Sequence, residues 1–142
     1  MPESGNPTGL SRMYRSVTHN IRVTVEPRYL PERSEPEARR YFWAYTVEIA
    51  NEGERPMQLR SRYWRITDAT GRTEEVRGPG VVGEEPVIMP GNAFTYTSGC
   101  PLSTSSGIMV GSYQMQLEDG RMLDVAIPAF SLDSPDTRRQ LN

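Results

Sequence analysis

The feature that most constrains the fold of this chain is the placement of large apolar side chains at every second position of residues 41–51, which read YFWAYTVEIAN. The apolar residues that share one face are Tyr41, Trp43, Tyr45, Val47 and Ile49. A period of two, built from aromatic and β-branched side chains, is typical of a half-buried β-strand. Elsewhere in the sequence, no window offers apolar residues at helical spacing over about ten positions. This segment therefore predicts a central strand in a protein built from strands.

Shorter segments repeat the alternation and are separated by turn signals. They cover residues 21–25, 57–67, 73–76, 94–98, 109–117 and 123–127. In the second of these segments the apolar face changes sides, because Met57 and Leu59 fall on one parity and Trp64 and Ile66 on the other. A β-bulge near residues 60–62 would reconcile the two halves. About seven to nine such strands predict an all-β, two-sheet β-sandwich with essentially no α-helix, and a small barrel is the competing architecture.

The bulk properties of the chain fit one cytoplasmic domain. Its 142 residues suffice for a single core, and 16 basic against 18 acidic residues give a net charge of −2. This balance provides no general attraction to nucleic acid or to an anionic membrane. A single cysteine favours a reducing compartment, and we expect neither a secretory signal nor a membrane span. Residues 1–16, rich in Pro, Gly and Ser, are expected to form a flexible arm, and residues 17–142 a single domain.

Residues 78–101, GPGVVGEEPVIMPGNAFTYTSGCP, contain five of the twelve glycines and four of the twelve prolines. This density predicts irregular backbone, because glycine permits positive φ and proline fixes φ. The apolar residues threaded through the stretch indicate an ordered connection that ends in a strand. Together with the loop at residues 103–107, it is expected to form a binding surface at one end of the sandwich. The candidate binding residues are Gly78, Gly80, Gly83, Glu84, Glu85, Thr97, Ser98 and Gly99.

Residues 78–83 also spell G-x-G-x-x-G, the phosphate-cradling pattern of dinucleotide-binding proteins. That chemistry needs a helix directly after the loop, whereas Glu84, Glu85 and Pro86 follow here, and carboxylates repel phosphate. A structural loop is therefore favoured. Weak contact of the glycine amides with an anion or a nucleotide remains open as the alternative.

A second candidate surface is a basic–aromatic face. Its residues are Arg60, Arg62, Tyr63 and Trp64. Arginines beside aromatic rings could present such a face to nucleic acid or to a phosphorylated ligand. The acidic residues interspersed nearby, Asp68, Glu74 and Glu75, favour instead an ordinary sheet face of mixed charge.

The sequence offers no catalytic constellation. With one histidine, His19, and one cysteine, Cys100, a closed metal site of nitrogen and sulfur ligands cannot be built within one chain. Cys100 precedes Pro101 without a local base, which favours a buried or half-buried thiol over a nucleophile. Glu84 and Glu85 are more typical of a solvated acidic turn than of a magnesium site. We therefore expect no catalytic residue, no metal and no cofactor.

Three motifs in this order, GVVGEEP (residues 80–86), PGNAFTYTSG (residues 90–99) and GSYQM (residues 111–115), resemble the ApaG family, and the resemblance extends from Tyr14 over nearly the whole remaining chain. It implies an immunoglobulin-like or fibronectin type III-like sandwich. It also implies an association with cobalt tolerance and magnesium efflux in bacteria, without agreed catalytic residues, and protein-interaction roles for similar eukaryotic domains. Such sequences commonly carry a histidine where this chain has Tyr63, so a role for that imidazole is in doubt here.

These observations favour a non-catalytic binding or protein-interaction module whose protein partner the sequence does not identify. The alternative is a protein or enzyme that handles a phosphate-containing small molecule, such as a nucleotide or pyrophosphate, through residues 78–83. Homodimerisation through an exposed edge strand is a third expectation. Any link to metal tolerance is expected to be indirect, through a partner.

Overall fold

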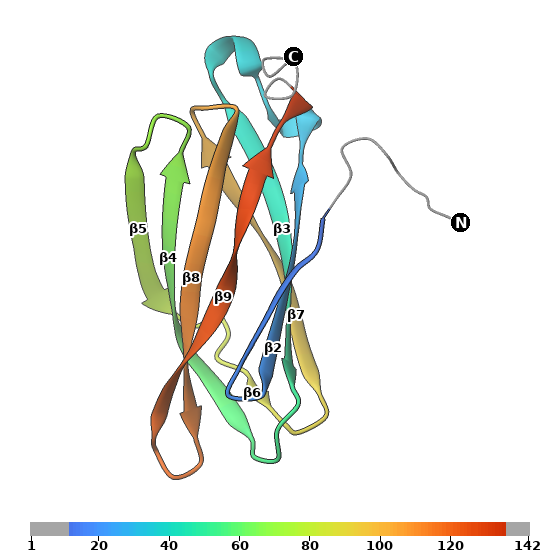
Figure 1. The fold of residues 1–142 in the computed structure, drawn as a ribbon, viewed down its shortest axis with the longest axis vertical. Helices are drawn as coiled ribbons and strands as arrows, with labels where there is room; N and C mark the ends of the chain where they lie inside the picture. The colour runs from blue at the N-terminus through green and yellow to red at the C-terminus, as the bar shows by residue number, and fades with distance from the viewer. Residues whose placement is uncertain (1–11, 136–142) are drawn as a thin grey trace, which may run out of the picture.

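The computed structural model describes residues 12–135, and over this range it is built almost entirely from strands (Figure 1). Its regular elements are β1 (Tyr14–Thr18), β2 (Ile21–Tyr29), two short 3-10 helices η1 (Pro31–Arg33) and η2 (Pro36–Ala38), β3 (Tyr41–Asn51), β4 (Met57–Asp68), β5 (Thr73–Pro79), β6 (Val87–Ile88), β7 (Ala93–Leu102), β8 (Ser106–Leu117) and β9 (Met122–Asp133). The prediction of an all-β protein with seven to nine strands is confirmed.

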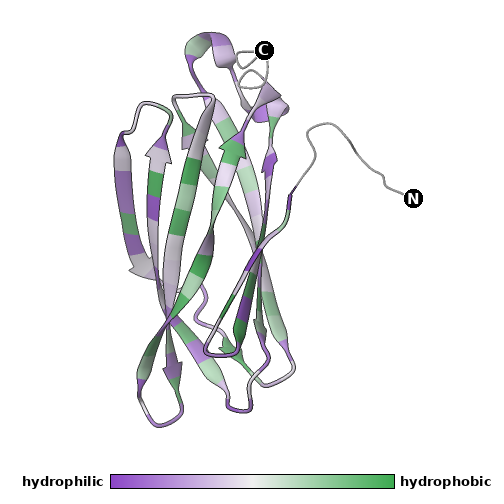
Figure 2. Ribbon diagram, viewed as in Figure 1, coloured by the Kyte–Doolittle hydropathy of each residue, from purple (hydrophilic) through white to green (hydrophobic). Residues whose placement is uncertain are grey.

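The strands form two antiparallel sheets packed face to face (Figure 1). The first sheet has the order β1-β2-β3-β7, and the second has the order β5-β4-β8-β9. The short β6 pairs with the beginning of β4, which β5 leaves uncovered. Hydrophobic and hydrophilic residues alternate along the strands (Figure 2), as a sheet with one buried face requires. The two-sheet β-sandwich is therefore confirmed, and the barrel alternative is wrong.

The core lies between the two sheets and is made of their inward-facing alternate residues. Its fully buried members include Ile21, Val23, Val25, Trp43, Val47, Ile49 from the first sheet and Leu59, Met109, Tyr113, Met115, Ile127, Phe130, Leu132 from the second. The indole of Trp43 donates a hydrogen bond from Nε1 to the carbonyl oxygen of Asp133, 2.9 Å away, which ties the centre of the first sheet to the end of β9. Buried tryptophan needs such a partner, because an unpaired N–H in the core costs free energy.

The expected β-bulge in β4 is confirmed at Arg60. The pairing of β4 with β8 shifts register between Leu59 and Ser61, so Arg60 is the extra residue. Leu59 is buried before the bulge and Trp64 after it, although the two positions differ in parity. The bulge thus keeps both halves of a long strand facing the same core.

Pro27 and Pro128 lie inside β2 and β9, beyond the predicted segments 21–25 and 123–127, so both strands are longer than the alternation alone indicates. The amide of Leu30 donates to the carbonyl of Phe42, so the even-numbered residues of β2 bond to β3 and Pro27 is directed to the other edge. There it lies beyond Val25, the last residue that β1 covers, and no ladder bond is lost. Pro128 lies at a second register shift, in the edge strand β9, where a missing donor is also tolerated.

The ordered domain begins earlier than the predicted boundary at residue 17. Residues Tyr14, Arg15 and Ser16 pair with Val25, Thr24 and Val23 in the ladder between β1 and β2. The strand therefore starts inside the predicted arm 1–16, whose residues 1–11 lie outside the described range. Over residues 12–135, no helix is long and apolar enough to cross a bilayer.

Candidate functional site

The glycine-rich loop is held by two arginines of β4. The guanidinium of Arg62 lies against Gly78, and its Nη1 donates to the carbonyl oxygens of Pro79 and Gly80, both at 2.9 Å. The backbone of Arg60 accepts the Gly80 amide at 2.9 Å, and its guanidinium forms an ion pair with Glu85 at 3.1 Å. Two residues of the predicted basic–aromatic face therefore contact three of the predicted binding residues, Gly78, Gly80 and Glu85, and the arginines fix the loop backbone.

The tip of this loop is a two-residue hairpin turn. Val81 and Glu84 exchange backbone hydrogen bonds of 2.9 and 2.8 Å, and the residues between them, Val82 and Gly83, have φ values of 43° and 81°. Positive φ at both central positions is the type I′ turn, which favours Asn-Gly. A β-branched residue in this conformation is strained. Val81 is buried at 1% exposure, whereas the strained Val82 is 53% exposed.

The phosphate-binding alternative is not supported by this geometry. The amides of Gly80, Val81 and Glu84 already donate to backbone carbonyls, so they do not form an anion-binding nest. Nη1 of Arg62 donates to the carbonyls of Pro79 and Gly80, so this part of the guanidinium is already engaged by the loop backbone. The loop leads into the two-residue strand β6, not into a helix whose N-terminus could face a phosphate.

The predicted basic–aromatic face is wrong as a single face. Tyr63 lies on the outer surface of the second sheet, where its hydroxyl donates to Glu75 at 2.6 Å and Arg77 stacks on its ring at 4.4 Å. That hydrogen bond raises the pKa of the Tyr63 phenol. Trp64 is buried and meets Phe130 edge-on, with ring centroids 5.9 Å apart. Neighbouring residues of a strand point to opposite sides, so Tyr63 and Trp64 cannot share a surface.

The residues Thr97, Ser98 and Gly99 lie on β7 in the other sheet. The hydroxyl of Thr97 hydrogen-bonds to that of Thr46 at 2.9 Å on the outer face, and the ring of Phe42 lies over Gly99. Ser98 faces inward and its hydroxyl hydrogen-bonds to Tyr45. The eight candidate binding residues are therefore divided between two sheets, and Thr97 and Gly99 face away from the core.

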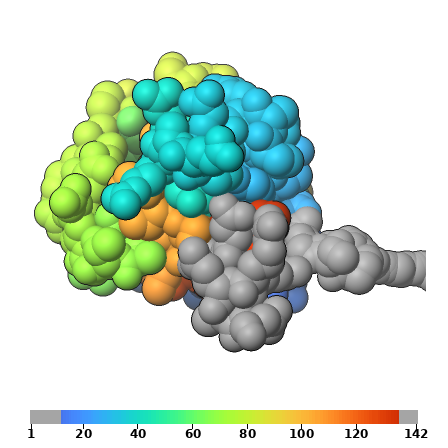
Figure 3. Space-filling view, turned by 90° about the horizontal axis from the view of Figure 1, so that it is seen from above, coloured from blue at the N-terminus to red at the C-terminus, as the bar shows by residue number. Residues whose placement is uncertain are grey.

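The loop at residues 103–107 does not join the glycine-rich loop in one surface. The amide of Ala69 donates to Thr104 at 3.1 Å, which places this loop beside the turn between β4 and β5. Figure 3 looks onto that end of the molecule, where the segment with η1 and η2 also lies. The glycine-rich loop follows the opposite end of β5, so the expected joint surface is wrong.

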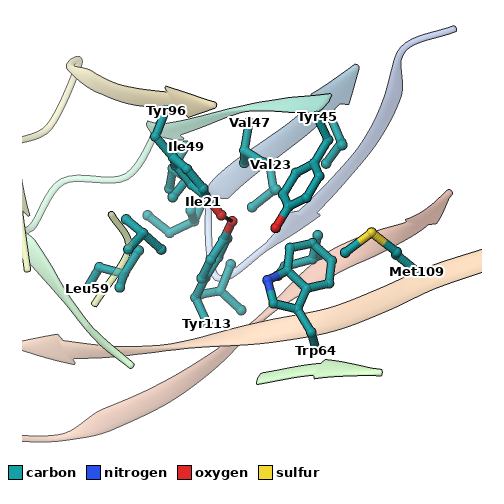
Figure 4. Close-up of a cluster of buried hydrophobic side chains, with 14 of the residues drawn as sticks. Ile21, Val23, Tyr45, Val47, Ile49, Leu59, Trp64, Tyr96, Met109 and Tyr113 are labelled. Carbon is teal, nitrogen blue, oxygen red and sulfur yellow. Dashed lines mark hydrogen bonds between the residues drawn. The ribbon is translucent and has the colours of Figure 1, made fainter. Parts of the chain in front are cut away.

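The sequence did not reveal a cluster of three buried tyrosines between the sheets. The hydroxyls of Tyr96 and Tyr113 meet at 2.5 Å, and Tyr45 points into the same region beside Trp64 (Figure 4). Burial raises the pKa of all three phenols, most strongly for Tyr96 and Tyr113, and the charge of Arg62 opposes the shift. These hydroxyls stay protonated at neutral pH, so the cluster is a structural network and not a source of general bases.

The single thiol and the acidic residues behave as packing and surface groups. Burial raises the pKa of Cys100 to about 11, which removes the thiolate that nucleophilic chemistry needs. Within residues 12–135, no three His, Cys, Asp or Glu side chains come together in an arrangement that could hold a metal ion.

Two glycines of the loop provide a matched pair for a stability test. A Cβ at Gly80 would lie 2.2 Å from the carbonyl oxygen of Glu84, whereas at Gly83 nothing lies within 4 Å. Both residues have positive φ, so Gly83→Ala is expected to lower the free energy of unfolding by about 1 kcal/mol and Gly80→Ala by about 2 kcal/mol. Urea unfolding of both variants measures the difference. Equal losses would show that the loop relaxes around Gly80 without strain.

Comparison with known proteins agrees with this architecture. The family model described as "ApaG domain" matches residues 31–117. Proteins named ApaG from Rhodopseudomonas palustris and Brucella anthropi are each 62% identical over 130 residues, covering 92% of this chain and all of theirs. A crystal structure of an ApaA protein from Bordetella pertussis is 50% identical, has a TM-score of 0.79 and is matched over 81% of this chain and 94% of that one. The chain therefore belongs to the ApaG domain family.

Proposed function

We propose that this chain is a non-catalytic protein-interaction module that acts in the cytoplasm and contacts its partner through residues 80–89. The observation that carries the proposal is Val82, an exposed β-branched residue at a φ of 43° on the tip of a rigid turn. Asn in its place would satisfy the turn without strain. Strain of this kind persists where the surrounding structure enforces it, and it gathers at functional sites.

Two further apolar side chains follow Val82 in the same segment. Val87 is 56% exposed and Met89 is 48% exposed, while Ile88 between them is buried against the core. Exposed apolar residues on an ordered loop suit recognition of an apolar surface on another protein, because little conformational freedom is lost on binding.

Hydrogen bonds hold the backbone beneath these side chains. The amide of Leu59 donates to the backbone carbonyl of Pro86 at 2.9 Å. The side chains of Gln58 and Asn51 donate to the backbone carbonyls of Glu85 and Ile88, respectively, each at 2.9 Å. The loop therefore presents its apolar groups in one conformation before a partner arrives. In this proposal, the association with cobalt tolerance and magnesium efflux that the family resemblance implies would be indirect, through such a partner.

The test compares Val82→Asn with the wild type in affinity capture from a cytosolic extract. This variant restores the preferred Asn-Gly turn, so it is expected to raise the free energy of unfolding by about 1 kcal/mol while it loses the captured protein. The control is Ile108→Thr, which removes an apolar side chain of 51% exposure on β8 and is expected to leave capture unchanged. Capture by Val82→Asn at the wild-type level would contradict the role of the loop.

A further inference from the structure

We propose that β7 pairs antiparallel with β7 of a second copy of this chain. The strand is an edge of the first sheet, and its ten residues, AFTYTSGCPL, include no charged side chain. Long uncharged edge strands are templates for further pairing, and proteins usually protect them with charges, bulges or covering segments. The inference rests on the backbone of β7 and is independent of the function proposed for residues 80–89.

The hydrogen bonds around β3 establish which groups of β7 face outward. Phe42 accepts from Leu30 at 2.9 Å and donates to the hydroxyl of Ser34 at 3.0 Å, so its backbone groups point away from β7. Its partner in the ladder is Pro101, which has no N–H to offer. At the other end of β3, the amide of Asn51 donates to the carbonyl of Asn92 at 2.9 Å.

Both observations show that the even-numbered residues of β7 form the backbone hydrogen bonds to β3, because ladder bonding alternates along an antiparallel strand. The odd-numbered residues Thr95, Thr97 and Gly99 therefore direct their N–H and C=O groups to the open edge. All three residues are exposed. Within residues 12–135, no strand pairs with this edge of β7.

The other sheet edges carry the protection that β7 lacks. The edge strand β5 bears Glu74, Glu75 and Arg77 within seven residues. The edges of β1 and β9 close against each other, since Ser16 donates to the carbonyl of Ala126 at 3.1 Å and the Ala126 amide donates to Thr18 at 3.2 Å. Among the described residues, the contrast identifies β7 as the edge that is open to a partner strand.

A second copy can pair with this edge about a two-fold axis at Thr97, because the residues that then face each other are compatible in size and charge. Thr97 would face Thr97 of the second copy, and Thr95 would face its Gly99, with about six N–H···O bonds among these residues. No like charges are opposed, and threonine pairs across strands are favourable. The hydroxyl bond between Thr46 and Thr97 already orders the central side chain. The two four-stranded sheets would become one continuous sheet.

The test is sedimentation velocity of the full chain from about 5 to 500 µM, a range that detects weak self-association. The wild type is expected to show a concentration-dependent monomer–dimer equilibrium. Thr97→Lys sets two lysines face to face on the axis and is expected to weaken dimerisation at least about tenfold. The matched control is Thr46→Lys, which breaks the same hydroxyl bond one strand further in and is expected to change the dimer Kd less than about threefold.

A mixture of two oppositely charged variants is expected to restore the dimer. Thr97→Lys and Thr97→Glu are each expected to be monomeric alone, and an equimolar mixture is expected to recover a heterodimer, since the axis then joins opposite charges. Thermal unfolding confirms that each variant is folded. A monomeric wild type at the highest concentration, or a Thr97→Lys dimer as tight as the wild type, would overturn the proposal.

Discussion

The free energy of unfolding is expected to fall steeply as the pH rises above 10. Burial raises the pKa of Tyr45, Tyr96 and Tyr113 in the folded protein, whereas in the unfolded chain each phenol ionises at a pKa of about 10. Below that pH both states hold the protons and stability is unaffected. Between that pH and the raised pKa of the folded state, the unfolded state loses the proton first. Tyr96 and Tyr113, whose pKa values are raised most, therefore each remove up to about 1.4 kcal/mol per pH unit, and Tyr45 adds to the loss in the same direction.

The thiol of Cys100 adds to this decline at slightly lower pH. Its pKa is raised by burial from 9.0 to about 11, so the stability that it contributes is lost progressively as the pH rises across that interval. Cys100→Ala is expected to flatten the curve between pH 9 and 10 and to leave the steeper, tyrosine-dependent fall above pH 10. Urea unfolding at pH 8, 9, 10 and 11 measures both effects.

Substitution of one member of the hydroxyl pair tests the assignment to the tyrosine cluster. Tyr96→Phe removes the 2.5 Å hydrogen bond to Tyr113 and is expected to cost about 1–2 kcal/mol at pH 8. Above pH 10 the slope of stability against pH is expected to be smaller by about 1.4 kcal/mol per unit. A wild-type stability that stays level between pH 9 and 11 would show that these phenols ionise as readily in the folded protein.

The sequence predicted the sandwich because the burial of a strand face is a local, periodic property. Each inward residue of β3 is identified by its neighbours two positions away. The bulge at Arg60 follows from the same rule, since the change of parity between Leu59 and Trp64 has no other solution in one continuous strand. The strands β2 and β9 continue past Pro27 and Pro128, because a proline ends a strand only where its missing N–H would face a partner, and both residues avoid that.

The candidate site was harder to predict because it depends on pairing between distant strands. The hydrogen bond from Arg62 to the carbonyl of Gly80 forms only when β5 lies beside β4, so the sequence of Arg62 and its neighbours does not indicate it. Nothing in the dipeptide Val82-Gly83 indicates a type I′ turn, for which valine is a poor residue. The turn forms because Val81 is buried and Glu84 pairs with it, so tertiary contacts override the local preference.

Asn51 lies at the end of β3 and is only 2% exposed, and its replacement by alanine is expected to lower the free energy of unfolding by about 4 kcal/mol. Its Nδ2 donates to the carbonyls of Arg55 at 2.8 Å and Ile88 at 2.9 Å, and its Oδ1 accepts from the amide of Gly53 at 2.9 Å. One side chain therefore joins the turn between β3 and β4 to β6. Truncation leaves the buried carbonyl of Ile88 without this donor, and it also removes the partly buried bonds to Gly53 and Arg55.

Asn51→Asp separates the hydrogen-bond explanation from a simple loss of volume. A carboxylate has nearly the same shape and can still accept from Gly53, but it cannot donate, and its charge faces the carbonyl oxygens of Arg55 and Ile88. It is therefore expected to lose at least as much stability as alanine at neutral pH. The control is Gln58→Ala, which removes one exposed amide hydrogen bond to Glu85 and is expected to cost under about 1 kcal/mol in urea unfolding. If Asn51→Asp were as stable as the wild type, the two donated bonds would not hold these loops together, and the rigidity proposed for residues 80–89 would lose its support.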